Sequence, residues 1–233
     1  MRCQRRSARC SVADLLVTGT DTGVGKTVIA AAILISLRER GERVVGFKPT
    51  ESGVTSDTPS DSAILAKASG LDTPLARPLV HFEEALAPAV AGERAGHLLI
   101  PKAVDDRIRA LRTLAGRVIV EGAGGALVPL AWDYTVLDLA MRHGLEAIIV
   151  GHAGLGTLNH VALTFEALRS RRIPVRAVVL NSRSSTPSLP EQTNPAALAR
   201  ILPAIPIAVV PRHDTADTLL AAYASVPFVA NLV

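Results

Sequence analysis

The sequence predicts a single α/β domain with a doubly wound, mostly parallel sheet. Apolar strand-like runs alternate with helical patterns along the 233 residues, and a glycine-rich loop separates the first run from the first helix. Alternation of this kind implies right-handed crossovers between parallel strands. Hydrophobic residues make up 48% of the chain and aromatic residues only 3%. Ala, Val, Leu and Ile must therefore fill the core, which suits strands covered by helices on both faces.

Each expected element follows from a local pattern. Strands are short apolar runs, whereas helices show longer periodic patterns and end near a glycine, as at Gly41 and Gly70. The expected strands are residues 15–18, 43–47, 117–120, 147–150, 177–180 and 205–210. The expected helices are residues 26–40, 60–68, 101–114, 135–143, 158–171, 195–202 and 217–223. The stretch 182–195, rich in Ser, Thr and Pro, is predicted to be a surface loop within the same domain.

The first 13 residues carry the whole net positive charge. The formal charge is +4, and residues 1–13 contain four arginines and no acidic residue. The remaining chain, 14–233, holds 21 basic and 21 acidic side chains, so the domain offers no electrostatic footprint for nucleic acid. The extension loosely resembles an organelle transit peptide. Because no amphipathic helix is evident, a disordered basic extension or an over-long gene start is the favoured interpretation.

The sequence also argues against a membrane or secreted protein. No apolar run approaches the roughly 18 residues of a membrane span. The two cysteines, Cys3 and Cys10, both lie in the extension and provide no disulfide framework. We therefore expect a cytoplasmic protein that binds neither membrane nor nucleic acid.

A glycine-rich segment at residues 19–27, GTDTGVGKT, joins the first expected strand to the first expected helix. Its glycines let backbone N–H groups turn toward phosphate oxygens, and the helix N-terminus adds a positive dipole end. Lys26 is placed to neutralise the β- and γ-phosphates of ATP, and the Thr27 hydroxyl to bind Mg²⁺. Five residues rather than four separate Gly19 from Gly25, which departs from a strict Walker A motif. The competing interpretation is a glycine-rich turn that merely caps a helix.

Lys48 follows the second expected strand in the segment FKPTESG. Ligands of doubly wound sheets bind beyond the carboxyl ends of the strands, and Pro49 favours an extended backbone at Lys48. The chain has only four lysines beside 21 arginines, and a guanidinium does not replace the compact point charge of an ammonium. We therefore expect Lys48 to reach a γ-phosphate. A solvated surface lysine is the alternative.

Two carboxylates are candidates for binding Mg²⁺, an ion that prefers oxygen ligands. Glu121 follows the third expected strand in the segment EGAGG, whose glycines allow the backbone to approach a nucleotide or substrate. Asp61 opens a helix after the Lys48 loop. For Asp61 the alternative role is ordinary stabilisation of the helix dipole.

Two later positions are also candidates for the site. The segment 154–160, GLGTLNH, follows the fourth expected strand and opens a helix, where Gly156 and Thr157 equally suit a tight turn and a cap. Asn181 follows the fifth expected strand and carries a donor and an acceptor for a purine edge. Simple loop chemistry is the alternative for Asn181.

Together these segments resemble the dethiobiotin synthetase family. The resemblance rests on TGTDTGVGKT, FKPTESG, VEGAGGALVPL, LGTLNH and LNS, in that order, and runs from about residue 15 to the end of the chain. It is loose over residues 82–105 and in the C-terminal third. It implies a ligase of biotin biosynthesis that uses ATP and Mg²⁺ to join CO₂ to 7,8-diaminononanoate, closing a cyclic urea.

The resemblance also implies roles for individual residues. Lys26 and Lys48 are the expected catalytic residues, which stabilise charge on the transferring phosphoryl group and on a carbamate. Thr27, Asp61 and Glu121 are the expected Mg²⁺ ligands. The expected substrate contacts are Thr22 and Ser52 and, across a homodimer interface, Gly156, Thr157 and Asn159. The expected nucleotide contacts are Gly23, Val24, Gly25, Lys26, Thr27, Val28, Asp61, Glu121, Gly122, Ala123, Gly124, Asn181, Ser182, Pro211, Arg212 and His213. Some members of the family carry an acidic residue at the position of Gly23, so a side-chain contact to the nucleotide is missing there.

Two other classes of protein are alternatives. A cobyrinate-type, amidase-coupled synthetase usually brings a glutaminase domain with a reactive cysteine, and this chain has no cysteine beyond Cys10. Partitioning and adaptor ATPases with a related loop carry a second lysine five residues before the loop lysine, where this chain has Asp21. The neutral charge of the domain also disfavours this second class.

Overall fold

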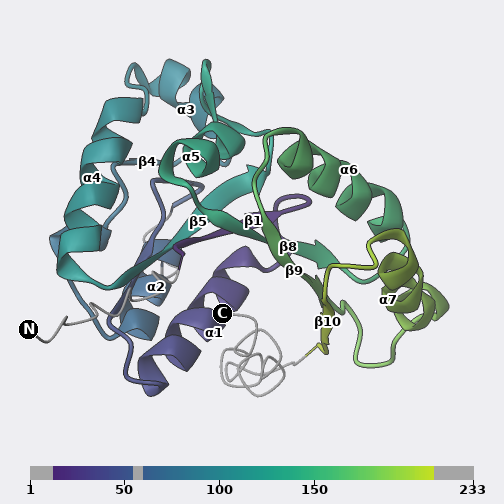
Figure 1. The fold of residues 1–233 in the computed structure, drawn as a ribbon. Helices are drawn as coiled ribbons and strands as arrows, with labels where there is room; N and C mark the ends of the chain where they lie inside the picture. Colours follow the sequence, from purple (N-terminus) through teal and green to yellow (C-terminus); the bar gives the residue numbers. More distant parts are fainter. Residues whose placement is uncertain (1–12, 55–59, 213–233) are drawn as a thin grey trace, which may run out of the picture.

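The computed structural model describes residues 13–54 and 60–212 and contains one central six-stranded sheet (Figure 1). The strands lie in the order β10-β9-β8-β1-β5-β2, and every neighbouring pair is parallel. Their bounds are β1 (Leu15–Gly19), β2 (Val44–Phe47), β5 (Arg117–Gly125), β8 (Glu146–His152), β9 (Val175–Asn181) and β10 (Ile207–Val210). Each matches one of the six predicted strands, although β2 and β10 begin one and two residues later than predicted. The doubly wound parallel fold is confirmed.

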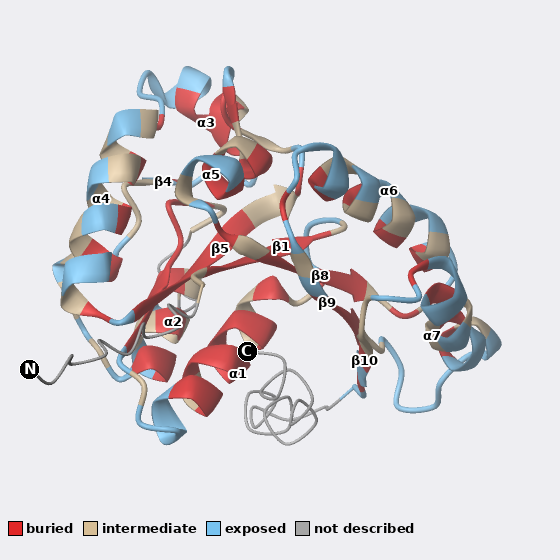
Figure 2. Ribbon diagram, viewed as in Figure 1, coloured by how far each residue is buried: buried red, intermediate tan, exposed pale blue. Residues whose placement is uncertain are grey.

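Helices cover both faces of this sheet (Figure 1). They are α1 (Lys26–Glu39), α2 (Asp61–Ser69), α3 (Pro88–Ala95), α4 (Pro101–Leu114), α5 (Val136–His143), α6 (Thr157–Ser170) and α7 (Leu189–Ile201). In β1, Leu15 and Val17 pack with α1 and α2, whereas Leu16 packs in the cluster that contains residues of α4 to α7. Most strand residues are buried (Figure 2), because successive side chains point to opposite faces that are both covered by helices.

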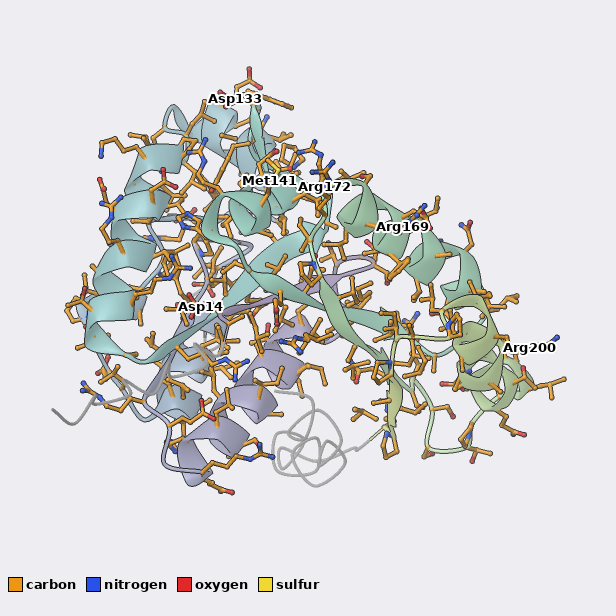
Figure 3. All side chains as sticks on the ribbon, in the orientation of Figure 1. Asp14, Asp133, Met141, Arg169, Arg172 and Arg200 are labelled. Carbon is orange, nitrogen blue, oxygen red and sulfur yellow. The ribbon has the colours of Figure 1, made fainter. Side chains whose placement is uncertain are left out.

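Small elements that the sequence did not predict lie beside the central sheet. They are β3 (Thr50–Ser52), a one-turn helix at Pro74–Ala76, β4 (Val80–Phe82), α3, β6 (Pro129–Ala131) and β7 (Tyr134–Thr135). The strands β3 and β4 pair in parallel, and β6 and β7 form an antiparallel hairpin. Asp133 lies at the tip of that hairpin, far from Arg200 on α7 (Figure 3). Strands of two or three residues carry too little periodicity to be predicted from sequence.

Several predicted boundaries were wrong, and those of β5 and β9 bear on the site. β5 runs to Gly125 rather than ending at residue 120, because Gly19 of β1 pairs with Gly125 and continues the ladder. Glu121 therefore lies within the strand, and Asn181 is the last residue of β9 rather than the first residue after it.

The helix predicted at 195–202 begins at Leu189 instead, so residues 189–195 of the predicted surface loop are helical. Ser188 and Glu191 form a capping box at its start, and a proline lies in its first turn. Pro195 lies inside the helix and removes one N–H donor without ending it.

Most predicted helices are present with small shifts at their ends. The helix near 135–143 begins behind a capping box of Thr135 and Asp138 and ends at Gly144. Residues 217–223, predicted as a last helix, and nearly all of the N-terminal extension lie outside the described residues. No helix within 13–54 and 60–212 has both the length and the apolar character needed to cross a membrane.

Candidate active site

The carboxyl edge of the sheet carries a cavity of about 680 Å³ beside the glycine-rich loop. The loop between β1 and α1, the β2–β3 connection, the start of α2 and the end of β5 all contribute to its walls. These segments lie far apart in the sequence and meet here because parallel strands end at the same edge of the sheet. The predicted residues that line the cavity are Thr22, Gly23, Gly25, Lys26, Thr27, Val28, Lys48, Ser52, Asp61, Glu121, Ala123 and Gly124.

The glycine-rich loop requires glycine at its last position. Gly25 adopts φ +95°, in the left-handed region, and a Cβ there would lie 2.4 Å from Nδ2 of Asn181. Gly25 also precedes α1 with no side-chain cap, so the N–H groups of the first turn remain available to an anion. Lys26 Nζ donates a hydrogen bond to the Asp21 carbonyl over 2.9 Å, which holds the ammonium within the curve of the loop.

Lys48 forms ion pairs with both carboxylates predicted from the sequence, Asp61 and Glu121. Its ammonium contacts Asp61 Oδ2 and lies 2.8 Å from Glu121 Oε1. Burial lowers the pKa of Lys48, but Glu121 and Asp61 together outweigh this effect and raise the pKa above its ordinary value. Lys48 therefore remains a cation at neutral pH despite being only 8% exposed. Burial lowers the pKa of Lys26, the second lysine of the site.

Glu121 is the most deeply buried ionisable group of the site. Its Oε1 accepts hydrogen bonds from Thr27 Oγ1 over 2.9 Å and from Lys48, whereas its buried Oε2 has no partner among the described residues. Burial raises the pKa of this carboxyl, and Lys48 and Thr27 oppose the effect. A buried carboxylate oxygen left without a donor is costly. It suits a hard cation, so Glu121, Thr27 and Asp61 form an oxygen donor set that fits Mg²⁺.

The predicted nucleotide-edge residues lie beside the loop rather than in the cavity lining. Asn181 Nδ2 donates to the Val24 carbonyl over 2.6 Å. The Ser182 N–H donates to the carbonyl of Val210, and Arg212 donates to the carbonyl of Arg183. These bonds bring residues 181–182 and 211–212 together at the ends of β9 and β10. His213 lies outside the described residues.

The β8–α6 loop, residues 153–156, does not line the cavity. Asn194 of α7 fixes it by donating to the carbonyls of Ala153 and Gly154 over 2.9 and 2.8 Å. Gly156 adopts φ +94° and precedes α6 with no side-chain cap. Thr157 is buried, whereas Asn159 is exposed. The roles assigned to Gly156, Thr157 and Asn159 remain predictions about a neighbouring subunit.

Several cavity residues were not identified from the sequence. They are Thr50, Ile64, Ala85, Leu86, Ala87, Pro88 and Val128. Pro88 at the start of α3 is a helix-start signal. The alternation of Lys48, Thr50 and Ser52 is a strand signal for one cavity-facing side. The apolar wall at residues 85–88 had no recognisable signal, because short alanine- and leucine-rich loops occur in many settings.

The sheet order, the phosphate loop and the buried lysines define a nucleotide-binding P-loop protein. A family model described as an AAA domain matches residues 13–219. Proteins named ATP-dependent dethiobiotin synthetase BioD are similar to this chain. The one from Anaeromyxobacter dehalogenans strain 2CP-C is 44% identical over 200 residues, which cover 84% of this chain and 89% of the relative. The one from Bacillus licheniformis is 40% identical and covers 86% of each chain. The chain belongs to the ATP-dependent dethiobiotin synthetase family.

Solved structures support the fold independently. The septum site-determining protein MinD of Pyrococcus horikoshii, complexed with Mg-ADP, superposes with a TM-score of 0.54 at 17% identity, covering 94% of this chain and 98% of that one. A ParA family ATPase from Chlorobium tepidum superposes with a TM-score of 0.55 at 19% identity, covering 94% of each chain. At such identities the likeness establishes the P-loop fold alone.

Proposed function

We propose that this protein is a cytoplasmic enzyme of biotin biosynthesis that synthesises dethiobiotin by ATP-driven ring closure. The observation that carries the assignment is the placement of Lys48 between Glu121 and Asp61, on the wall of the cavity that the phosphate loop also lines. Two buried lysines and an oxygen donor set at one phosphate loop suit phosphoryl transfer, which needs positioning and charge neutralisation more than covalent catalysis.

The reaction joins CO₂ to 7,8-diaminononanoate in three steps. One amine attacks CO₂ and loses a proton, which forms a carbamate. A carbamate oxygen then attacks the γ-phosphorus of ATP, the bond to ADP breaks, and a carbamic–phosphoric anhydride results. The second amine attacks the carbonyl carbon, expels inorganic phosphate and loses a proton, which closes the cyclic urea.

The two lysines divide the charge stabilisation. Lys26 is held in the curve of the loop and stabilises charge on the β- and γ-phosphates. Lys48 lies across the cavity, where a compact ammonium stabilises the carbamate and the transferring phosphoryl group. Thr27, Asp61 and Glu121 hold Mg²⁺, which neutralises phosphate charge when it is bound.

The substrate and the base of ATP occupy opposite sides of the phosphate loop. Thr22 and Ser52 line the cavity and offer hydroxyls to the diamine or its carbamate. The apolar wall at residues 85–88 suits the methylene chain of the substrate. Asn181 and Ser182, with Pro211 to His213, bind the adenine edge.

The working enzyme is a homodimer in which the β8–α6 loop of one subunit reaches the substrate of the other. Leu155 in this loop is 92% exposed, and Leu127 and Leu163 are 62% and 61% exposed on a shallow groove beside α6. Exposed leucines that gather on a groove are typical of an interface. The uncapped start of α6 suits the carboxylate tail of the substrate.

One assay tests the proposed reaction. Purified protein is incubated with 7,8-diaminononanoate, bicarbonate, Mg²⁺ and ATP, and dethiobiotin and ADP are quantified by mass spectrometry. We expect equal amounts of the two products, and no dethiobiotin when the diamine or bicarbonate is omitted. ATP hydrolysis without dethiobiotin formation would overturn the proposal and favour a partitioning or adaptor ATPase.

A further inference from the structure

Glu51 lies on the opposite side of β3 from the cavity. The chain alternates here, so that Lys48, Thr50 and Ser52 line the cavity while Glu51 points away from it. Glu51 is only 5% exposed, and a buried carboxylate requires strong hydrogen-bond donors. Within residues 13–54 and 60–212, both donors come from Ser62, whose N–H lies 2.8 Å from Oε1 and whose hydroxyl lies 2.9 Å from Oε2.

Ser62 is the second residue of α2, directly after Asp61. The first turn of a helix has free N–H groups, and a carboxylate that binds one of them also stabilises the helix dipole. Ser60 already caps this helix through the N–H of Ala63. The hydrogen bonds of Glu51 therefore add a second contact at this helix start, which holds the beginning of α2 against β3.

The position of the Asp61 carboxylate depends on this contact more than that of the Glu121 carboxylate does. The side chain of Glu121 is fully buried within the sheet, whereas the side chain of Asp61 is 41% exposed. Packing thus fixes Glu121 directly, but the position of the Asp61 carboxylate follows from where the first turn of α2 is held. Lys48 contacts both Asp61 and Glu121. The contact between Glu51 and Ser62 is therefore linked through Asp61 and Lys48 to Glu121.

We propose that Glu51 is a positioning residue for the metal site: by holding Ser62, it sets Asp61 at the distance from Glu121 that Mg²⁺ requires. This inference rests on the proposed role of Asp61 as a metal ligand. Mutation of a residue that orients a metal ligand through a hydrogen bond typically lowers metal affinity by about 10- to 100-fold. A loss on this scale is therefore the expected effect of removing Glu51.

The test measures Mn²⁺ affinity of the protein–ADP complex by electron paramagnetic resonance, alongside the Mg²⁺ dependence of turnover. We expect Glu51→Ala to weaken Mn²⁺ binding about tenfold or more and to raise the Mg²⁺ concentration for half-maximal rate similarly. Glu51→Gln retains one acceptor oxygen, and Ser62→Ala retains the N–H donor. Both variants should show smaller losses, and the double variant Glu51→Gln/Ser62→Ala should lose less than the sum of the two single effects.

The matched control is Ser69→Ala at the other end of α2, where the buried hydroxyl donates to the Ala66 carbonyl over 2.8 Å. It removes this bond and the one that Ser69 accepts from the Leu71 N–H, both far from Asp61, so Mn²⁺ affinity should stay unchanged. If Glu51→Ala does not fold, Glu51→Gln and Ser62→Ala carry the test.

The variant Asp61→Asn distinguishes the metal role of Asp61 from the positioning role of Glu51. If Asp61→Asn weakens Mn²⁺ binding but the Glu51 and Ser62 variants bind it like the unaltered protein, or no worse than Ser69→Ala, Glu51 is purely structural and the inference fails. If Asp61→Asn itself leaves Mn²⁺ affinity unchanged, the metal role of Asp61 fails, and the positioning role of Glu51 fails with it.

Discussion

The Lys48 ammonium lies 2.8 Å from Glu121 Oε1, and the side chains of the two residues are only 9% and 0% exposed. A pair of this kind combines two roles that mutation can separate. The positive charge pairs with a buried carboxylate, and in the proposed mechanism the compact ammonium stabilises the transferring phosphoryl group. Arginine preserves the first property and loses the second.

We predict that Lys48→Arg retains most of the thermal stability but lowers kcat by about 100-fold or more, the scale of losing one correctly placed donor to the charge of a transition state. Lys48→Ala should lose turnover similarly. It should also lower Tm by roughly 10 °C, because an unpaired buried charge costs about 3–5 kcal/mol. Steady-state kinetics and thermal melts measure both effects. Lys102→Ala, on an exposed helix position, is the control. A Lys48→Arg enzyme with unaltered kcat would contradict the catalytic role.

The second prediction concerns the metal requirement. Glu121→Ala and Asp61→Ala should each raise the Mg²⁺ concentration for half-maximal rate, because each removes an oxygen donor beside the triphosphate. The effect should be larger for Glu121, whose Oε2 is buried without a partner in the described structure. Asp106→Asn, an exposed acid on α4, should behave like the unaltered protein. Unchanged magnesium titrations for both site variants would assign the carboxylates a structural role.

The central site could be predicted from sequence because local patterns fix the ends of strands. Lys48 and Glu121 stand at or near the carboxyl ends of apolar runs, and Lys26 follows the glycine-rich loop after another such run. Parallel strands bring those ends to one edge. The hydrogen bond between Thr27 and Glu121 joins residues 94 positions apart, yet it follows from that topology. The chain has only four lysines, and two of them, Lys26 and Lys48, are buried at this site.

The remaining features depend on tertiary contacts that have no local pattern. Glu51 belongs to a three-residue strand, and its contact with Ser62 exists only because α2 packs beside that strand in the folded protein. The start of α7 was missed because Pro195 resembles a helix start, although the capping box of Ser188 and Glu191 lies earlier. The cavity wall at residues 85–88 was missed because its apolar side chains line the cavity without any periodic pattern.

The third prediction concerns the N-terminal boundary of the domain. Deletion of residues 1–12 should leave Tm and activity unchanged, whereas deletion of residues 1–14 should lower Tm. Asp14 lies directly before β1 (Figure 3). It accepts hydrogen bonds from Arg112 and from the Val118 N–H, and its carbonyl accepts one from Glu146. Arg117 also donates to the Ala13 carbonyl over 2.8 Å. A large drop in Tm for the shorter deletion would show that the extension packs on the domain.

The fourth prediction concerns the pH dependence of stability at Glu191. Hydrogen bonds from Ser188 and from the Arg183 N–H lower the pKa of this carboxyl below its ordinary value of 4.5. The carboxylate therefore contributes stability above the pKa of the unfolded chain, and the contribution disappears as pH falls through the lower folded value. Glu191→Gln should lower Tm near neutral pH, and the difference should vanish in acid. Glu166→Gln is the control, because the Glu166 carboxylate pairs with Arg169 on the exposed side of α6. A difference in Tm that is constant with pH would exclude the electrostatic origin.

The last prediction concerns the composite active site of the proposed homodimer. Asn159 is exposed on α6 and does not line the cavity of its own subunit, so its substrate contact requires a neighbour. Lys48→Ala disables the cavity, and Asn159→Ala disables the contact that the partner supplies. Each homodimer should be poor, whereas a mixed dimer regains one site with both residues intact. Activity of a fully exchanged equimolar mixture should therefore exceed that of either parent and approach about a quarter of the unaltered value, because half of the dimers are mixed and each has one intact site. Exchange is verified by native mass spectrometry, and mixing Lys48→Ala with a Lys48→Ala/Asn159→Ala double variant is the control that should recover nothing. If proven exchange brings no activity above the parents, the substrate is enclosed by one subunit alone.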